Sequence, residues 1–589
     1  MSDEVKITKK EEAKLEREKK RKAAEALKEK QKLEKQERMK AIVDAYSDLA
    51  GQLKRHVKMT DLIDMGGDNI TPDMVKHHFR NLSRLEEAAR DAYPDKFHDV
   101  SLSDLLGPKA LHRLSNVIGN YKRFVITTAV TGCVVDKEFL DSINSFCDKN
   151  NAALLVLVAS DPAHNLPSKD GQARLGSVDK DLLSCATIVM TDTALNNNVY
   201  LSTIKLSAKH IDPITSLSRI GQRNGSFIYA SPKQRMKAYP VSNEKFPHVL
   251  MTTGAITTPS YTTENYMSER TAYIAEHDHV MGAIILETED DEIFHYRQIQ
   301  ADDEGSFIDL AVQYNSDGST SYCPPAGIAL GDWHSGSTDQ SAKKAWEEVI
   351  DETSPKRIFL HDGFDGRSIN HHERKNGILR AKRAMAGQAV LKTELDNYAK
   401  DLDYLAEMVD ELVLVKSNHD EVLIRYLMDG YYVQDPLNHR LSLDLAAAAM
   451  DGHDPLQWYM EKQNLKNWKK ITWLSRDEDY FISKIQMGAH GDKGCNGARG
   501  SLRSMENAYG NSVTGHTHTP EILRGAWQVG TSSLLKLTYN VGPSSWFHTS
   551  CLVYENGSRQ LISSIDGDWR MATDSYTLGD EDALQGDRD

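Results

Sequence analysis

The 589 residues are 40% apolar and 27% charged, a composition typical of a folded globular protein of about three or four domains. Residues 1–40 carry 15 Lys/Arg and 10 Asp/Glu, although the chain as a whole has a net charge of -15. This distribution excludes a uniformly basic nucleic-acid coat but allows an acidic body that binds cations. No apolar run approaches the roughly 20 residues that span a bilayer, and the charged N-terminus is unlike a secretory signal. Six scattered cysteines suit a reducing compartment, so we expect a cytoplasmic protein without a membrane partner.

The N-terminal residues 1–56 are rich in Lys, Glu, Ala, Leu, Gln and Arg. Strong helix formers with Glu/Lys pairs at helical spacing favour one long, solvated helix, which can also form a weak coiled coil. We expect this helix to support a homo-oligomer. The alternative is a basic arm that contacts nucleic acid.

Residues 57–120 are predicted to form a small helical domain. Thr71 as N-cap and Pro72 at the first helical position are typical of a helix start. The apolar residues that then share one helical face are Val75, Phe79, Leu82 and Leu85. Short helices of this kind suit either a helix-turn-helix or a helical spacer, and the sequence leaves both open.

Residues 121–325 are expected to form a smaller α/β module. Apolar runs at 124–129 and 154–158 predict two buried strands, with a helical pattern between them. This order predicts a βαβ unit. Its loops contain neither GxGxxG nor GxxxxGK[ST], so no nucleotide site is expected.

Residues 326–570 alternate strands with helices, and potential metal ligands follow the strands. Strands predicted at 328–330, 357–360 and 412–415 run into Asp-Trp-His, His-Asp-Gly and Asn-His-Asp. Two further histidine segments lie at 488–491 and 514–518. Open α/β folds place their sites at the carboxyl ends of strands, so we expect these segments to converge. Strands near 534–539 and 551–554 should complete this domain. Residues 571–589 are acidic and are predicted to form a disordered tail.

The residue types in these segments point to divalent cations. Hydrolysis of a phosphodiester needs an activated water and neutralisation of charge on the phosphate. Two cations about 3.5–4 Å apart supply both. Imidazole and carboxylate ligands without thiolates suit Mn²⁺, Mg²⁺, Fe²⁺ or Zn²⁺ in a catalytic site. A single Asp-x-His segment is weak evidence, whereas five such segments in order are strong evidence.

The order of the segments resembles the calcineurin-like metallophosphoesterase family: D-x-H, G-D-x-x-[DG], G-N-H-[DE], a later G-H, and G-H-x-H. The resemblance implies a four-layer α-β-β-α sandwich that holds two divalent ions, with Mn²⁺ favoured. It also implies that Asp362 bridges the two ions. The other implied ligands are Asp332, His334 and His518 for one ion, and Asn418, His490 and His516 for the other.

Two further residues receive catalytic roles from the same resemblance. His419 lies where the family has a histidine that contacts the phosphate and protonates the leaving group. Asp420 is positioned to orient it. An imidazole suits proton transfer near neutral pH.

The sequence departs from the family pattern at two places. His361 replaces the glycine before the bridging aspartate, and Ser417 replaces the glycine before Asn418. These changes affect the local turn geometry and remove no ligand. Asp365 aligns with the family's second acidic position, and we do not assign it as a ligand.

A closer resemblance rests on segments at 124–129, 231–235, 252–257 and 569–570. They resemble large bacteriophage proteins in which a βαβ module precedes a metallophosphoesterase, among them pre-early DNase-like proteins of T-five-type siphophages. This implies a phage early protein in the host cytoplasm that degrades DNA with SbcD-class nuclease chemistry. We therefore predict a metal-dependent DNase. The alternatives are a phosphatase or small phosphodiesterase with the same metal site, and a DNA-binding regulatory protein whose site is vestigial.

A basic cluster lies between the second and third metal segments. We assign Arg374, Lys375 and Arg380 as candidate substrate-binding residues, because a cluster of this kind can grip a phosphate backbone. A solvated helix face is the alternative. The cluster consists of Arg367, Arg374, Lys375, Arg380, Lys382 and Arg383.

Overall fold

The computed structural model describes residues 9–53, 57, 59–80, 82–97, 99–102, 105, 108–160, 176–242, 246–261, 269–373, 376–537 and 540–572. They form a mixed α/β fold with several sheets and an N-terminal helical region. The α/β class and the helical N-terminal region agree with the prediction from the sequence. The chain divides into two compact units. One comprises residues 1–104, 132–134 and 162–180, and the other comprises 105–131, 135–161 and 181–589. In the described ranges, every helix is too short or too polar to cross a membrane.

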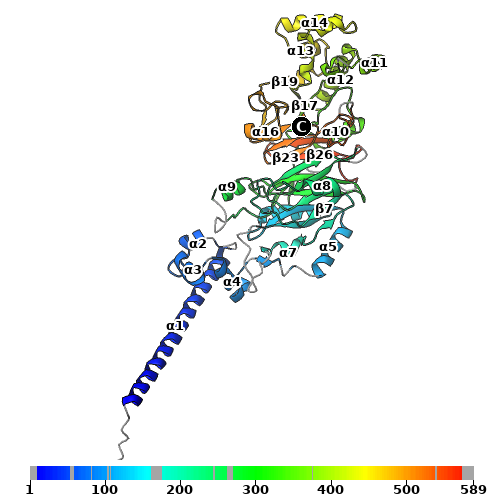
Figure 1. Ribbon diagram of the computed structural model, residues 1–589. Coiled ribbons are helices and arrows are strands. Elements are labelled where there is room, and N and C mark those ends of the chain that lie inside the picture. The colour runs from blue at the N-terminus through cyan, green and yellow to red at the C-terminus, as the bar shows by residue number, and fades with distance from the viewer. Residues whose placement is uncertain are drawn as a thin grey trace, which may run out of the picture. The chain divides into compact units, whose positions relative to one another are not determined.

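The first unit is mainly helical (Figure 1). Its elements are α1 (Lys9–Leu53), α2 (Met59–Asp64), α3 (Pro72–Phe79), α4 (Leu82–Ala92) and the antiparallel pair β1 (Asp99–Ser101) and β4 (Ser177–Asp179). The end of α1 packs with α3 and α4 in one apolar core around Tyr46 and Val75. The part of the predicted 57–120 domain between Val57 and Phe97 thus shares a core with the end of α1, whereas residues 105–120 belong to the second unit. Residues 14–38 of α1 are exposed. The side chain of Thr71 caps α3 by accepting from the Met74 N–H, which confirms the predicted helix start.

A five-stranded sheet in the second unit contains the predicted βαβ unit. Its strands, in spatial order, are β12 (Phe294–Gln300), β11 (Gly282–Thr288), β2 (Arg123–Val130), β3 (Ala152–Ala159) and β5 (Thr187–Ile188). β2 and β3 are parallel and joined through α6 (Lys137–Lys149), so the βαβ prediction is confirmed. A separate three-stranded sheet consists of β13 (Phe307–Asp309), β14 (Val312–Tyr314) and β15 (Thr320–Tyr322).

A ten-stranded sheet contains strands from both 121–325 and 326–570. Its strands, in spatial order, are β20 (Phe481–Ile482), β21 (Ile485–Gln486), β22 (Ser512–Thr514), β24 (Ala526–Gln528), β23 (Glu521–Leu523), β9 (Arg235–Tyr239), β10 (His248–Thr252), β8 (Ser226–Tyr229), β7 (Val199–Ser202) and β6 (Thr193–Ala194). β9 pairs with β23, and the buried Arg235 guanidinium donates to Glu521 at 2.8 Å. Strands from both sides of the domain boundary expected at 325/326 therefore belong to one continuous sheet.

A six-stranded sheet carries the first metal-type segments. Its strands, in spatial order, are β19 (Ile471–Trp473), β18 (Glu411–Val415), β17 (Arg357–His361), β16 (Gly327–Ala329), β25 (His548–Val553) and β26 (Arg559–Ser564). β16 to β19 are parallel. Residues of these strands, such as Ile358 and Leu412, enter a core with α10 (Gln340–Thr353) and α12 (Leu391–Glu407). Trp346 and Leu402 of these helices are fully buried in it. This core fixes where the parallel strands end.

The other helices of the second unit connect these sheets. They are α5 (Pro108–Asn120), α7 (Leu182–Cys185), α8 (Ser218–Asn224), α9 (Glu269–His277), α10 (Gln340–Thr353), α11 (Gly377–Met385), α12 (Leu391–Glu407), α13 (Asp420–Met428), α14 (His439–Met450), α15 (Pro455–Glu461) and α16 (Leu502–Tyr509). The helix expected at 389–410 is α12, whose buried stripe follows the predicted helical spacing.

The strand expected at 534–539 is wrong for its described part, because residues 534–537 are not in a strand. The Asn540 side chain accepts from the Leu537 N–H at 2.8 Å and donates to the Leu535 carbonyl at 2.9 Å. Side-chain hydrogen bonds of this kind compete with strand pairing. The segment is therefore a loop, and Leu534 is 45% exposed.

The core beneath the parallel strands gives a stability prediction. Leu402→Ala removes a side chain that is fully buried under β17 and β18 and should lower the free energy of unfolding by about 2–5 kcal/mol. Urea denaturation followed by circular dichroism measures the shift. The exposed Lys400→Ala on the same helix is the matched control and should stay within about 0.5 kcal/mol of wild type. Equal shifts for both variants would contradict this packing.

Candidate metal centre

Four candidate ligands lie in loops that follow strands of the six-stranded sheet. Asp332 and His334 follow β16, Asp362 follows β17, and Asn418 follows β18. Because these strands are parallel neighbours, their carboxyl ends meet at one edge of the sheet. The loops after β16 and β17 stay paired beyond the strands, and the His334 N–H donates to the Asp362 carbonyl at 2.8 Å.

The other three candidate ligands come from the ten-stranded sheet. His490 follows β21, and His516 and His518 follow β22. The Gly515 N–H donates to the His490 carbonyl at 2.8 Å, which holds these two loops together. The His516 N–H donates to Asp332 Oδ2, also at 2.8 Å. This bond joins the loops of the two sheets at one point.

Four of the candidate ligands have left-handed backbone conformations. The φ angles are 49° at His334, 45° at Asp362, 81° at His516 and 60° at His518. Such angles are uncommon for residues other than glycine. They persist where the surrounding structure fixes them, and they concentrate at functional sites. The strain at these positions turns consecutive side chains of short loops toward the same centre.

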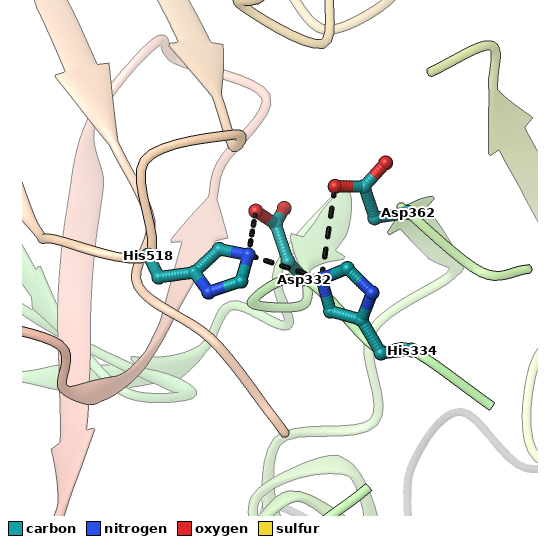
Figure 2. A group of neighbouring side chains, drawn as sticks. All are labelled: Asp332, His334, Asp362 and His518. Carbon is teal, nitrogen blue, oxygen red and sulfur yellow. Dashed lines mark hydrogen bonds and ion pairs between the residues drawn. The ribbon is translucent and has the colours of Figure 1, made fainter. Parts of the chain in front are cut away.

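Asp332, His334, Asp362 and His518 form a buried cluster, and Figure 2 shows their side chains directed at one another. The His518 Nε2 lies 3.1 Å from Asp332 Oδ2 and 3.0 Å from the His334 Nε2. The His334 Nε2 lies 3.7 Å from Asp362 Oδ2. One potential ligand atom from each of the four residues lies within 4.8 Å of the others. Two ligands about 2.2 Å from one ion, on opposite sides, are about 4.4 Å apart, so the cluster can hold a metal ion.

The remaining candidate ligands adjoin this cluster through Asp362. The His490 Nε2 lies 3.3 Å from Asp362 Oδ2, and the rings of His490 and His516 are 5.3 Å apart between centroids. The His516 Nδ1 lies 3.1 Å from the Asn418 Oδ1. The structure thus brings all seven candidate ligands into one group, with Asp362 between its two halves.

Unsatisfied polar atoms support a cation in this group. Asp332 Oδ1 and Asp362 Oδ1 are buried and accept no hydrogen bond from the described residues. Buried polar atoms without partners are costly, so such atoms call for a ligand. Carboxylate oxygens and imidazole nitrogens are donors that suit divalent transition metals.

Gly515 shows why the G-H-x-H segment begins with glycine. A Cβ atom at this position would lie 2.2 Å from Asp332 Oδ1 and 3.2 Å from the His361 side chain. The backbone of this loop therefore approaches the first candidate ligand more closely than any side chain allows. Glycine is required here for a steric reason, because a Cβ atom would collide with the Asp332 carboxylate, a candidate metal ligand.

The charges in the cluster shift the pKa values of its members. Burial alone would raise the pKa of Asp362, but the charges of His490 and His419 hold it well below its usual range. Burial alone would lower the pKa of His334, but contact with Asp365 and the charge of Asp362 raise it to about 9. The pKa of His490 is likewise raised to about 9, against the effect of burial, by Asp362. Protons thus compensate the buried carboxylates when no metal is bound.

The candidate catalytic His419 lies beside the cluster. Its ring centroid is 4.6 Å from that of His334, and its Nδ1 lies 2.8 Å from the carbonyl oxygen of Asp365. The Asp365 carboxylate lies 3.3 Å from the His334 Nδ1 and accepts from Arg367 at 3.0 Å. Asp365, His334 and His419 form a second group of potential ligand atoms. The sequence had shown only that Asp365 aligns with an acidic position of the family.

Asp420 contacts a different residue from the one expected. Its carboxylate accepts from the backbone N–H and the hydroxyl of Ser417, at 2.9 and 3.0 Å. Asp365 contacts His419 instead. Adjacent residues of a helix do not face each other, which fits the contact of Asp420 with Ser417. Ser417, the second departure from the family pattern, thereby closes the turn that precedes α13.

His361, the other departure from the family pattern, is fully buried next to the cluster. Its Nδ1 lies 3.5 Å from the Nδ1 of His490, whose other ring nitrogen faces Asp362. Burial lowers the pKa of His361 to about 4, so the ring is neutral. The side chain fills the space between His490 and Gly515.

Of the predicted substrate-binding residues, Arg374 and Lys375 lie outside the described residues. Arg380 is exposed on α11, with its guanidinium 5.7 Å from the centroid of the Tyr431 ring. It borders a small cavity of about 100 Å³, and neither His419 nor a candidate metal ligand lines that cavity.

The chain is similar to Protein A1 of Escherichia phage T5. The two are 29% identical over 476 residues, which cover 76% of this chain and 82% of that protein. No family model matches the chain, and no solved structure matches it. The similarity spans most of both proteins. It relates this chain to a bacteriophage protein whose name states no activity.

The close approach of Gly515 to Asp332 gives a prediction about metal binding. Gly515→Ala should weaken Mn²⁺ binding at least tenfold (about 1.4 kcal/mol), because the added Cβ displaces the carboxylate. Isothermal titration calorimetry with Mn²⁺ measures the loss. Gly119→Ala is the control, since a Cβ there meets no atom within 4 Å. Wild-type affinity in Gly515→Ala would contradict the proposed ligand geometry.

The raised pKa values of His334 and His490 predict that metal binding releases protons. Both imidazoles are protonated at pH 7 without metal and must be neutral to bind it. Mn²⁺ affinity should therefore fall as the pH is lowered from 9 to 6. Calorimetry at pH 7 in two buffers with different ionisation enthalpies should give different apparent binding enthalpies. Identical enthalpies in both buffers would show that no proton is released.

Proposed function

We propose that this chain is a metal-dependent DNase that hydrolyses phosphodiester bonds at the centre around Asp362. The observation that carries the proposal is the buried set of Asp332, His334, Asp362 and His518, with unsatisfied carboxylate oxygens and strained backbones. The likeness to a phage T5 protein supports a phage origin. DNA as the substrate, and an early function in the host cytoplasm, are what the sequence resemblance implies, and we propose them for this chain.

We propose a metallophosphoesterase sandwich as the scaffold of this centre. Its two inner layers would be the six-stranded sheet and the β20–β24 part of the ten-stranded sheet. Phe359 of the first packs edge-on against Tyr480, which precedes the second, with ring centroids 5.1 Å apart. The candidate ligands follow strands of both sheets, which is the arrangement that the resemblance implies.

Two divalent ions, with Mn²⁺ favoured over Mg²⁺, Fe²⁺ and Zn²⁺, fit this proposal. Asp362 would be shared, because its Oδ2 contacts both His334 and His490, one candidate ligand from each half of the group. When bound, such ions activate a water molecule and neutralise charge on the phosphate. Asn418 and His516, already 3.1 Å apart, would complete the half that contains His490.

The chain's own contribution to bond cleavage is assigned to His419. The Asp365 carbonyl fixes its Nδ1 at 2.8 Å, which leaves Nε2 as the nitrogen that exchanges a proton with substrate. The His419 side chain is 21% exposed, whereas that of His334 is fully buried, so His419 is within reach of a ligand from solvent. A positioned imidazole can donate the proton that the leaving oxygen requires.

A vestigial site in a DNA-binding regulatory protein is the weaker proposal. Loss of function removes the reason to keep buried charged groups, which destabilise a fold unless they are paired or bind an ion. Here the carboxylates of Asp332 and Asp362 are buried with an oxygen unsatisfied. Self-association through the exposed part of α1 stays a prediction.

The proposal is tested by plasmid cleavage in the presence of Mn²⁺. Asp362→Asn should abolish cleavage, and His419→Ala should slow it by about 10²–10⁴-fold while Mn²⁺ binding persists. The exposed His453→Ala and Asp451→Asn on the second unit are matched controls and should cleave like wild type. Undiminished cleavage by Asp362→Asn would exclude this centre. DNA binding without cleavage by wild type under any metal would support the regulatory alternative.

A further inference from the structure

A cavity of about 490 Å³ opens beside the candidate metal centre. Its lining includes His419 and Asp365 beside the metal centre, Lys382 of α11 and Lys536 of the 534–537 loop. Its volume falls in the range of about 300–1,000 Å³ that is typical of ligand sites. The cavity therefore connects His419, the proposed proton donor, with a space of ligand size.

The cavity is positively charged within an acidic protein. Four cationic side chains line it, against only two carboxylates, although the chain as a whole carries -15. One carboxylate, Asp365, contacts Arg367, and the other, Glu373, contacts Arg383. Lys382 is exposed and forms no ion pair with the described residues, so its charge is available to an anion. The second lysine of the lining, Lys536, donates to the Gly542 carbonyl at 2.9 Å.

The lining also contains apolar groups that suit the sugar and base of a nucleotide. Leu379 of α11 and Leu537 of the facing loop lie beside the two lysines. A smaller cavity of about 100 Å³ shares Arg367 and Arg383 with the first and is lined further on by Arg380 and Tyr431. Cations alternating with apolar and aromatic side chains are typical of a surface that follows a nucleic-acid strand.

We propose that this cavity binds the leaving-group side of a polynucleotide, with Lys382 and Lys536 in contact with the phosphates next to the one that is cleaved. The inference rests on the proposed function, because it uses His419 as the group that faces the leaving oxygen. It identifies the substrate class as a nucleic-acid strand that continues past the cleaved bond. A small phosphodiester would reach the metals without filling the cavity.

Lysine-to-glutamine variants separate these two kinds of substrate. We compare Lys382→Gln, Lys536→Gln and the double variant on an oligonucleotide and on bis(p-nitrophenyl) phosphate, with full-length protein and Mn²⁺. Each single variant should lower kcat/KM for the oligonucleotide about tenfold more than for the small ester. Each should also reduce the slope of log(kcat/KM) against log[salt] by about 0.7–0.9, the value for one lost phosphate contact. Lys400→Gln, exposed on α12 and outside the cavity, is the control and should change neither quantity.

The outcomes distinguish this inference from the proposed function. If wild type hydrolyses neither substrate with any divalent metal, the proposed function itself fails. If wild type hydrolyses the small ester but the lysine variants keep the wild-type salt slope, only the cavity assignment is overturned. An equal loss on both substrates would also overturn it, since that result indicates damage to the metal centre. A selective loss on the oligonucleotide, with a reduced slope, is the result we expect.

Discussion

The arrangement of the second unit depends on two carboxylates buried among imidazoles where two sheets meet. Asp332 and Asp362 are almost completely inaccessible, and the contacts of His518, His334 and His490 with them compensate their charge. Burying such charges without a partner would cost several kcal/mol per ion. The loops after β16, β17, β21 and β22 must therefore converge together, and left-handed backbones at the candidate ligands are the local consequence. A bound cation would replace protons as the compensating charge.

The sequence predicted this convergence because parallel strands carry a directional constraint. Asp332, Asp362 and Asn418 each follow an apolar run, and carboxyl ends of neighbouring parallel strands meet at one edge. The partner of His419 was not predictable in the same way. The resemblance gives the orienting role to Asp420, the next residue in the sequence, whereas the contact at His419 Nδ1 comes from the Asp365 carbonyl in another loop. Adjacency in sequence says little about facing side chains at a helix start.

Pairing between strands that are far apart in the chain could not be predicted from the sequence either. Nothing local indicates that β9 pairs with β23, so the division at 325/326 could not anticipate a sheet that crosses it. The 534–537 loop has a similar origin, because the hydrogen bonds of Asn540 outweigh an apolar pattern that favours a strand. In the proposed function that loop matters, since Lys536 lines the same cavity as Lys382 and His419.

Anomalous X-ray scattering from crystals grown with Mn²⁺ shows whether the candidate ligands share metal ions. We expect two anomalous peaks about 3.5–4 Å apart at Asp362, one beside His334 and His518 and the other beside His490. A map with no peak at Asp362, or with manganese bound only at other residues, would contradict this expectation.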